Sequence, residues 1–196
     1  MKMKAGTKPG ITLIELLIVM PMLIIGSIIL GLAVTRGWQA YLFASAQTKV
    51  SYESVNTLDR MSRVLRSTNK VVTAGPDEIT VECYFSPRDS VPDLVRYFVE
   101  NGMLMVETIP ASGTAPNYTY DPQQKTTNPI AQLKNGSAEP LFSYFSADEQ
   151  PLGATPDVAV IRTIAIQISL NPYPTILPRN QLNSTKVQLR NLKDNL

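Results

Sequence analysis

The sequence predicts an α+β protein in which one long N-terminal helix packs on an antiparallel β-sheet. Two observations carry this prediction. An apolar run passes without a break into an amphipathic stretch, and the later chain consists of short runs in which apolar and polar residues alternate. We expect four parts: a leader at 1–10, an apolar helix at 11–34, its amphipathic second half at 35–70, and a sheet-containing head at 71–196.

The apolar part, residues 11–34, carries a single charge, Glu15. As a helix it would span roughly 36 Å, more than the roughly 30 Å of bilayer hydrocarbon, so it can cross a membrane. A carboxylate there costs about 2.5–3.5 kcal/mol, and a proline such as Pro21 costs about 3 kcal/mol in a helix in water. The presence of both residues in this helix therefore needs an explanation. The simplest reason for Glu15 is that it lies near the interface and reaches water.

The residues around Glu15 indicate a more specific reason. Lys2, Lys4 and Lys8 precede Gly10, and Gly10 is followed by Ile11-Thr12-Leu13-Ile14-Glu15. This resembles the class III signal of type IV prepilins, which has a short basic leader, a glycine cleavage site, a hydrophobic first mature residue and glutamate at the fifth mature position. The match is local but specific in residue type and spacing.

This resemblance implies that a prepilin peptidase cuts between Gly10 and Ile11 and methylates the new amine of Ile11. It also implies assembly with other pilins or pseudopilins into a helical filament, in which Glu15 pairs with a neighbouring subunit's N-terminal amine and sets the axial register. Family helices can unwind in the filament, here at Pro21, Gly26 and Gly31. For the two glycines, close packing between membrane helices is an equal alternative.

The basic leader predicts a single-pass protein of the cytoplasmic (inner) membrane, with its N-terminus in the cytoplasm and its head exported. By resemblance, the partners are the peptidase, other filament subunits and an inner-membrane assembly platform, and the final location is a pilus or pseudopilus at the cell surface or in the periplasm. Two rivals are an ordinary secretory signal, with a weak cleavage site at Gly31-Leu32-Ala33, and an uncleaved signal anchor.

Composition excludes several classes of function. The net charge is +2, and without the three leader lysines 15 basic and 16 acidic residues remain, so we expect no nucleic-acid partner. The chain has no histidine and no phosphate-binding glycine loop, so we expect no enzyme, no metal and no cofactor. Asp148-Glu149 is a weak calcium candidate that is more simply a solvated turn. The single cysteine, Cys83, is predicted to be buried.

The stretch after the apolar helix is predicted to continue it to about Ser67. Val55, Leu58, Met61 and Leu65 recur every three or four residues as a core-facing stripe, and Asp59 can pair with Arg63 on the outside. The basic residues Arg60, Arg63, Arg66 and Lys70 are interpreted as a solvated face or, second, as a contact to a neighbour's acids. Trp38, Tyr41 and Phe43 are placed at the outer membrane interface.

Strands are expected after the break at Gly75-Pro76-Asp77. Three runs, 79–85, 94–99 and 103–109, form a predicted meander with a hairpin at Asn101-Gly102. Residues 110–140 are expected to be a long loop or a surface excursion partly ordered by Tyr118 and Tyr120, either for variable recognition or simply poorly ordered. Further strands are predicted at 141–145, 158–170 and 185–192, the last two as a hairpin.

The order of these last strands resembles the W-type minor pilins and the J-type minor pseudopilins. A single cysteine cannot form the disulfide loop of many Gram-negative major pilins, which favours a minor subunit. The first hypothesis is a minor subunit in, or initiating at the tip of, a type IV pilus or a type II secretion pseudopilus. The alternative is a pilin-like surface binding module, an adhesin or DNA-uptake subunit, that uses residues 110–140. An enzyme is a remote third possibility.

Overall fold

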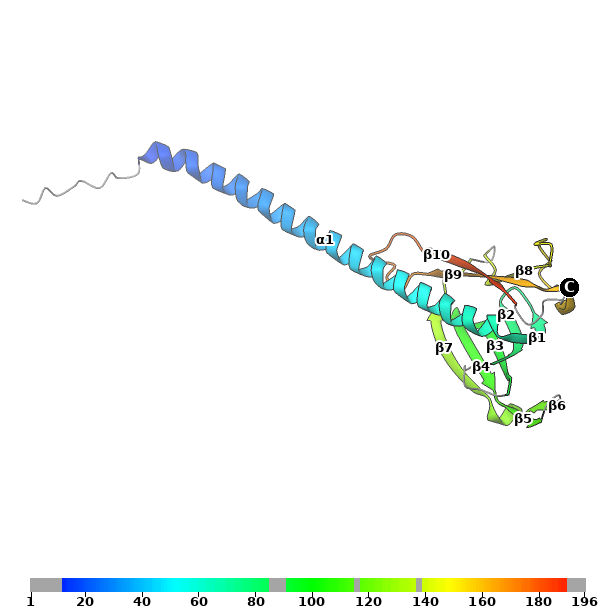
Figure 1. Ribbon diagram of the computed structural model, residues 1–196. Helices are drawn as coiled ribbons and strands as arrows, with labels where there is room; N and C mark the ends of the chain where they lie inside the picture. Colours follow the sequence, from blue (N-terminus) through cyan, green and yellow to red (C-terminus); the bar gives the residue numbers. More distant parts are fainter. Residues whose placement is uncertain (1–11, 85–90, 115–116, 137–138, 190–196) are drawn as a thin grey trace, which may run out of the picture. The chain divides into compact units, whose positions relative to one another are not determined.

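The computed structural model describes residues 12–84, 91–114, 117–136 and 139–189. The chain forms two compact units, Met1–Ser45 and Ala46–Leu196, and each is described by itself below. The element order is a long α-helix followed by strands that all pair antiparallel (Figure 1). The predicted α+β class, with a long N-terminal helix and a sheet head, is confirmed.

Helix α1 runs from Leu13 to Arg66 and is continuous through Pro21. It ends when the amide of Ser67 donates to the carbonyl of Val64, a tighter turn that closes the helix. The helix therefore ends close to Ser67, as predicted, and residues 68–70, which the predicted division of the chain placed in the helical part, belong to strand β1. Val71, Val72 and Thr73 are β-branched, and pairing with the next strand outweighs any tendency to extend the helix.

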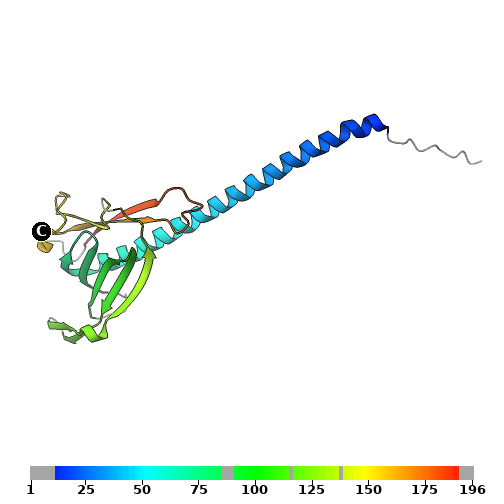
Figure 2. The ribbon, with the colours of Figure 1, turned by 180° about the vertical axis from the view of Figure 1, so that it is seen from behind.

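The larger sheet has five strands in the order β1-β2-β3-β4-β7, and Figure 2 shows it from behind. The expected meander is confirmed, because β2, β3 and β4 are neighbours in sequence order. Asn101 and Gly102 connect β3 to β4 with φ angles of 51° and 74°, which suits a two-residue hairpin turn. The strands are β1 (Thr68–Ala74), β2 (Glu78–Cys83), β3 (Asp93–Glu100), β4 (Met103–Ile109) and β7 (Thr126–Gln132).

The expectation of a long loop at 110–140 is wrong, because most of this stretch forms strands, whereas the alternative of a surface excursion around Tyr118 and Tyr120 fits its exposed hairpin. This stretch holds a separate hairpin, β5 (Ala111–Thr114) with β6 (Asn117–Tyr120), then a short 3₁₀ helix, η1 (Pro122–Gln124), and then β7. Only Ala131 of β7 is buried, so this strand lacks the apolar alternation that would reveal it in the sequence. Pro129 fits there because β7 is an edge strand.

The smaller sheet has the order β10-β9-β8, with β8 at Phe142–Phe145, β9 at Thr163–Leu170 and β10 at Gln181–Gln188. The predicted β9–β10 hairpin is confirmed, although β10 starts earlier than expected. The predicted strand start at Val158 is wrong: Val158–Val160 forms a 3₁₀ turn, η2, because the Asp157 carboxylate accepts a hydrogen bond from the Ala159 amide at 3.0 Å.

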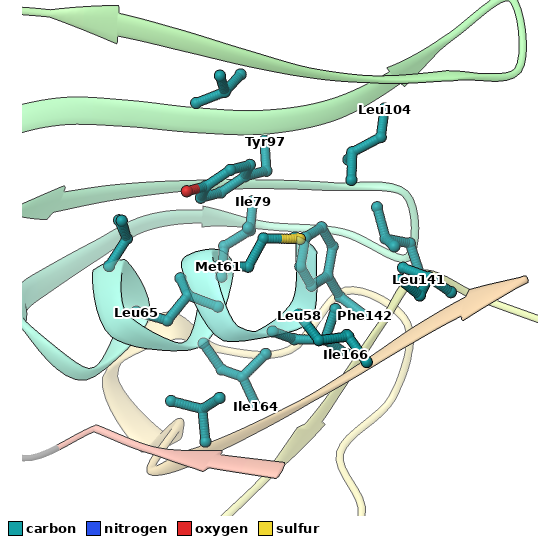
Figure 3. Packing of buried hydrophobic residues seen from close by; sticks show 14 of the residues in the cluster. Leu58, Met61, Leu65, Ile79, Tyr97, Leu104, Leu141, Phe142, Ile164 and Ile166 are labelled. Atoms are coloured by element: carbon teal, nitrogen blue, oxygen red, sulfur yellow. The ribbon is translucent and has the colours of Figure 1, made fainter. Parts of the chain in front are cut away.

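The core of the head lies around the second half of α1, which has strands of the larger sheet on one side and strands of the smaller sheet on the other (Figure 3). Leu58, Met61 and Leu65 are buried as predicted, but Val55 is 61% exposed. Buried Ser54 replaces it, because its hydroxyl accepts a hydrogen bond from Asn183 of β10 at 2.7 Å. The labelled side chains of the two sheets that belong to the same hydrophobic cluster are Ile79, Tyr97, Leu104, Phe142, Ile164 and Ile166.

Candidate functional site

The first turn of α1 is held by a reciprocal pair of side chains, Thr12 and Glu15. The Thr12 amide and hydroxyl both donate to Glu15 Oε2, at 2.9 and 3.0 Å, and the Glu15 amide donates to Thr12 Oγ1 at 3.3 Å. This is a capping box, which satisfies amides that the first turn of a helix leaves without partners. The sequence carried its signature, threonine followed three residues later by glutamate, and our sequence analysis missed it.

The capping box uses only one of the two carboxylate oxygens. Among the described residues, Glu15 Oε1 accepts no hydrogen bond, and the side chain is exposed. A carboxylate oxygen has further acceptor capacity, so the cap leaves Glu15 able to bind a cation or a donor from outside the chain. Capping and a contact with a second molecule are therefore compatible.

Beyond this turn, α1 presents an apolar surface that no described part of the chain covers. Every large apolar side chain from Leu13 to Val34 is at least half exposed. The helix is long and apolar enough to cross a membrane. Ser27 and Thr35 do not interrupt this surface, because their hydroxyls donate to helix carbonyls of Ile24 and Gly31 at 2.8 and 3.1 Å. Large exposed apolar surfaces are typical of sites that contact lipid or other proteins.

The structure places the other predicted site residues as follows. Gly10 and Ile11, the predicted cleavage and methylation residues, lie outside the described residues. Pro21, Gly26 and Gly31 lie within the continuous helix, and a side chain added at either glycine would meet no atom of this chain within 4 Å. Packing within the chain therefore does not require these glycines, and both alternatives, unwinding and close packing against another helix, remain.

The head contains a groove between the second half of α1 and the face of the larger sheet. We call it the α1–β7 groove; its volume is about 460 Å³, and its lining includes Arg60, Met61, Val64, Tyr97, Val106 and Ile130. The helix residues recur every three or four positions, so they form one stripe facing the sheet. Tyr97 and Val106 are direct partners on β3 and β4. Residues as far apart in the sequence as Arg60 and Ile130 thus line one groove, which no local motif predicts.

The rim of this groove is basic. The predicted Asp59–Arg63 ion pair is confirmed, and the hydrogen bond from Arg63 holds the pKa of Asp59 below its usual value. Arg60 is exposed and has no hydrogen-bond or ion-pair partner in the part of the chain that the structure describes. Burial raises the pKa of Tyr97, so its phenol stays protonated at neutral pH.

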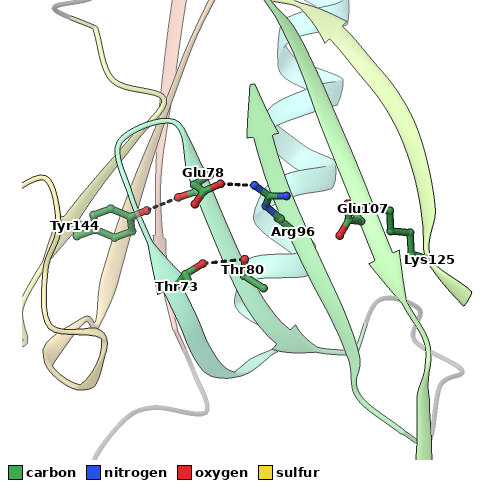
Figure 4. A network of polar contacts seen from close by, with 7 residues as sticks. All are labelled: Thr73, Glu78, Thr80, Arg96, Glu107, Lys125 and Tyr144. Atoms are coloured by element: carbon green, nitrogen blue, oxygen red, sulfur yellow. Dashed lines mark hydrogen bonds and ion pairs between the residues drawn. The ribbon is translucent and has the colours of Figure 1, made fainter. Parts of the chain in front are cut away.

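The opposite face of the larger sheet carries a chain of polar contacts (Figure 4). Arg96 pairs with Glu78 at 2.6 Å, Thr73 donates to Thr80 at 2.8 Å, and Lys125 pairs with Glu107 at 3.1 Å. The first two contacts join neighbouring strands, and the third joins Lys125, which directly precedes β7, to Glu107 of β4. Cross-strand pairs of this kind stabilise a sheet by roughly 0.2–1 kcal/mol each and need no catalytic explanation.

A metal site and a reactive thiol are two further kinds of functional site. Among the described residues, no three His, Cys, Asp or Glu side chains lie close enough to hold a metal ion. Cys83 is buried as predicted, and burial together with the nearby Asp93 charge raises the pKa of its thiol to about 12. A thiol in this state is a poor nucleophile and a poor partner for an intermolecular disulfide.

Comparisons with models of known protein families and with curated proteins found no match to this chain. Its proposed function therefore depends on its own residues.

Proposed function

We propose that this chain is a prepilin-like minor subunit that is cut between Gly10 and Ile11 and assembled into, or at the tip of, a type IV pilus or a type II secretion-like pseudopilus. The observation that carries the proposal is the exposed apolar part of the helix. Its one charged residue, Glu15, lies five residues after Gly10, and among the described residues one of its carboxylate oxygens accepts no hydrogen bond. By the same proposal, the chain first lies in the inner membrane with its N-terminus in the cytoplasm.

In this proposal Glu15 receives the N-terminal ammonium of Ile11 from a neighbouring subunit. Either charge alone is costly in an apolar environment, whereas the two attract strongly at short distance in a medium of low dielectric constant. A neighbour docked at the wrong height would leave both charges unpaired. The pair therefore selects the axial position of each incoming subunit, and the apolar surface of α1 supplies most of the binding free energy.

The capping box provides a competing explanation of Glu15, because a cap alone would account for a carboxylate at this position. Two substitutions separate the roles. Glu15→Gln keeps a side-chain oxygen that can close the capping box but removes the charge, since Gln serves as well as Glu at this position. Thr12→Val removes the hydroxyl of the box and leaves the carboxylate charged.

The test measures, in the cells that naturally produce the protein, the share of it recovered in sheared filaments relative to the membrane fraction. We expect Glu15→Gln to lower that share roughly 10-fold or more, because unpaired ammonium groups remain in the filament core. We expect Thr12→Val to change it less than about 3-fold, the effect of a lost cap on the helix end. The reverse ranking would mean that Glu15 acts only as a cap and would refute the proposed pairing.

The second candidate is a surface binding module. It is favoured by one observation: hairpin β5–β6 pairs with no strand of the other two sheets among the described residues, and most of its side chains are exposed. Such a module would keep its binding activity as a head without the apolar helix, residues 38–196. An assembly subunit would lose its activity in the same truncation.

A further inference from the structure

The α1–β7 groove combines an apolar floor with a single unpartnered charge. Met61, Val64 and Val106 are almost fully buried and form the floor, and Ile130 of β7 forms the outer wall. Arg60 stands at the rim without a counter-ion among the described residues. The second rim arginine, Arg63, is already paired with Asp59. Arg60 is therefore the rim cation that an incoming carboxylate can reach without breaking an ion pair.

The groove continues past Arg60 along β7. A second hollow of about 390 Å³ shares Arg60, Val106 and Ile130 with the first and adds polar side chains, among them Gln124 and Asn128. Both hollows have apolar and polar lining residues, and Arg60, Val106 and Ile130 line both of them. Because β7 is the edge strand of the larger sheet, no further strand blocks access from that side.

We propose that the α1–β7 groove docks a segment of a partner protein in which an aspartate or glutamate stands close to a large aliphatic or aromatic side chain. The apolar side chain fills the compartment above Met61 and Val106, and the carboxylate accepts hydrogen bonds from the Arg60 guanidinium. An extended segment fits the two joined hollows, and its carboxylate supplies the negative charge that complements Arg60. This inference concerns the head alone, so it stands or falls independently of cleavage at Gly10 and of pairing at Glu15.

The test is a selection with random 12-residue peptides displayed on phage, using the full-length protein in detergent. Three variants are selected in parallel. Arg60→Gln removes the rim charge, Ile130→Trp fills the apolar compartment, and Arg179→Glu changes an exposed arginine outside the groove. We expect the wild type and Arg179→Glu to enrich peptides with an acid within four positions of a large apolar residue, and the other two variants to lose this enrichment.

The affinity of one selected peptide is then measured by fluorescence anisotropy. We expect Arg60→Gln to weaken binding about 5-fold, the upper range for a partly exposed ion pair, and replacement of the peptide's acid by its amide to weaken wild-type binding equally. The selected peptide and its amide variant should bind Arg60→Gln with equal affinity. Circular dichroism checks that each variant keeps the fold. If Arg60→Gln keeps the fold and still binds the peptide as tightly as the wild type, the proposal is overturned.

Three other results would also overturn the proposal. The first is no enrichment above empty micelles, or enrichment of peptides without acids. The second is displacement of the selected peptide by free dodecanoate at similar concentration, which would make the groove a small-amphiphile site. The third is concentration-dependent self-association of the wild type that Ile130→Trp abolishes, which would make the occupant a second copy of this chain.

Discussion

The hydroxyl of Tyr144 donates a hydrogen bond to the backbone carbonyl of Gly75 at 2.7 Å, and so joins the smaller sheet to the turn between β1 and β2. Tyr144 is 1% exposed, so the contact lies inside the head. The Phe142 amide of β8 also donates to the carbonyl of Pro76 in the same turn, at 2.9 Å. These two directional contacts together fix how the β1–β2 turn is placed against β8.

Tyr144→Phe should destabilise the head by about 1–2 kcal/mol, because it removes a buried hydrogen bond and leaves the carbonyl without that donor. Pulse proteolysis in increasing urea measures the loss on the detergent-solubilised protein. Tyr52→Phe is the matched control, since Tyr52 is 75% exposed. Equal stability of the two variants would show that the contact contributes nothing.

Gly102→Ala should cost about 1 kcal/mol, because φ at this position is +74° and only glycine adopts that region without strain. The added methyl group itself has room, with its nearest neighbour, the Leu133 carbonyl oxygen, 3.8 Å away. Gly153→Ala is the control, since its added atom meets nothing within 4 Å. A cost at Gly153 as large as that at Gly102 would contradict the assigned turn.

The hydrogen bond from Asn183 to Ser54 should show a measurable coupling. Ser54 is fully buried on α1, and Asn183 reaches it from β10 at 2.7 Å. A double-mutant cycle with Ser54→Ala and Asn183→Ala should give a coupling energy of about 0.5–1.5 kcal/mol. Gln181, which donates to Ser51 at 2.7 Å, provides a parallel cycle with the neighbouring pair. If the stability losses of the single variants add to within about 0.3 kcal/mol in both cycles, these two hydrogen bonds do not contribute to stability.

Cys83 should make the head less stable at alkaline pH. The pKa of its thiol is raised from 9.0 to about 12 in the folded protein, chiefly by burial. The folded state therefore holds a proton that the unfolded state releases above pH 9, so the stabilisation is complete below pH 9 and is lost as pH rises towards 12. One such group gives a slope of up to about 1.4 kcal/mol per pH unit.

The measurement compares the wild type with Cys83→Ala between pH 9 and pH 10, so that titrations common to the two proteins cancel. The wild type should lose stability faster with rising pH than Cys83→Ala. The same thiol should react with a disulfide reagent only after unfolding. Rapid modification in the native protein at pH 8 would mean that the thiol is accessible.

Parts of the fold that depend on local pattern could be predicted from sequence. The turn at Asn101-Gly102 and the buried alternation of Ile164, Ile166 and Ile168 are such parts, because turn chemistry and a period of two are written in adjacent residues. Strand β1 could not be predicted, since only Thr68 and Val71 of its residues are buried and no helix stop signal precedes it. Strand β7 was missed for the same reason.

Of the two candidate sites, the one at the start of α1 could be predicted from the sequence and the groove in the head could not. Glu15 stood out because a charge in a long apolar run is visible without a structure, and the capping box with Thr12 was visible too. The α1–β7 groove was not, because Arg60, Tyr97 and Ile130 come from a helix and two strands that only the fold brings together. Val55 was placed in the core on spacing alone, and the hydrogen bond from Asn183 to Ser54 shows why a serine took that position.

The central claim, that this chain is a prepilin-like subunit, is tested most directly by the intact mass and N-terminal residue of the protein made with and without a prepilin peptidase. The account predicts a mature chain that begins at N-methylated Ile11 and appears only when the peptidase is present. An intact N-terminus in both cases, or a cut near Ala33, would contradict it.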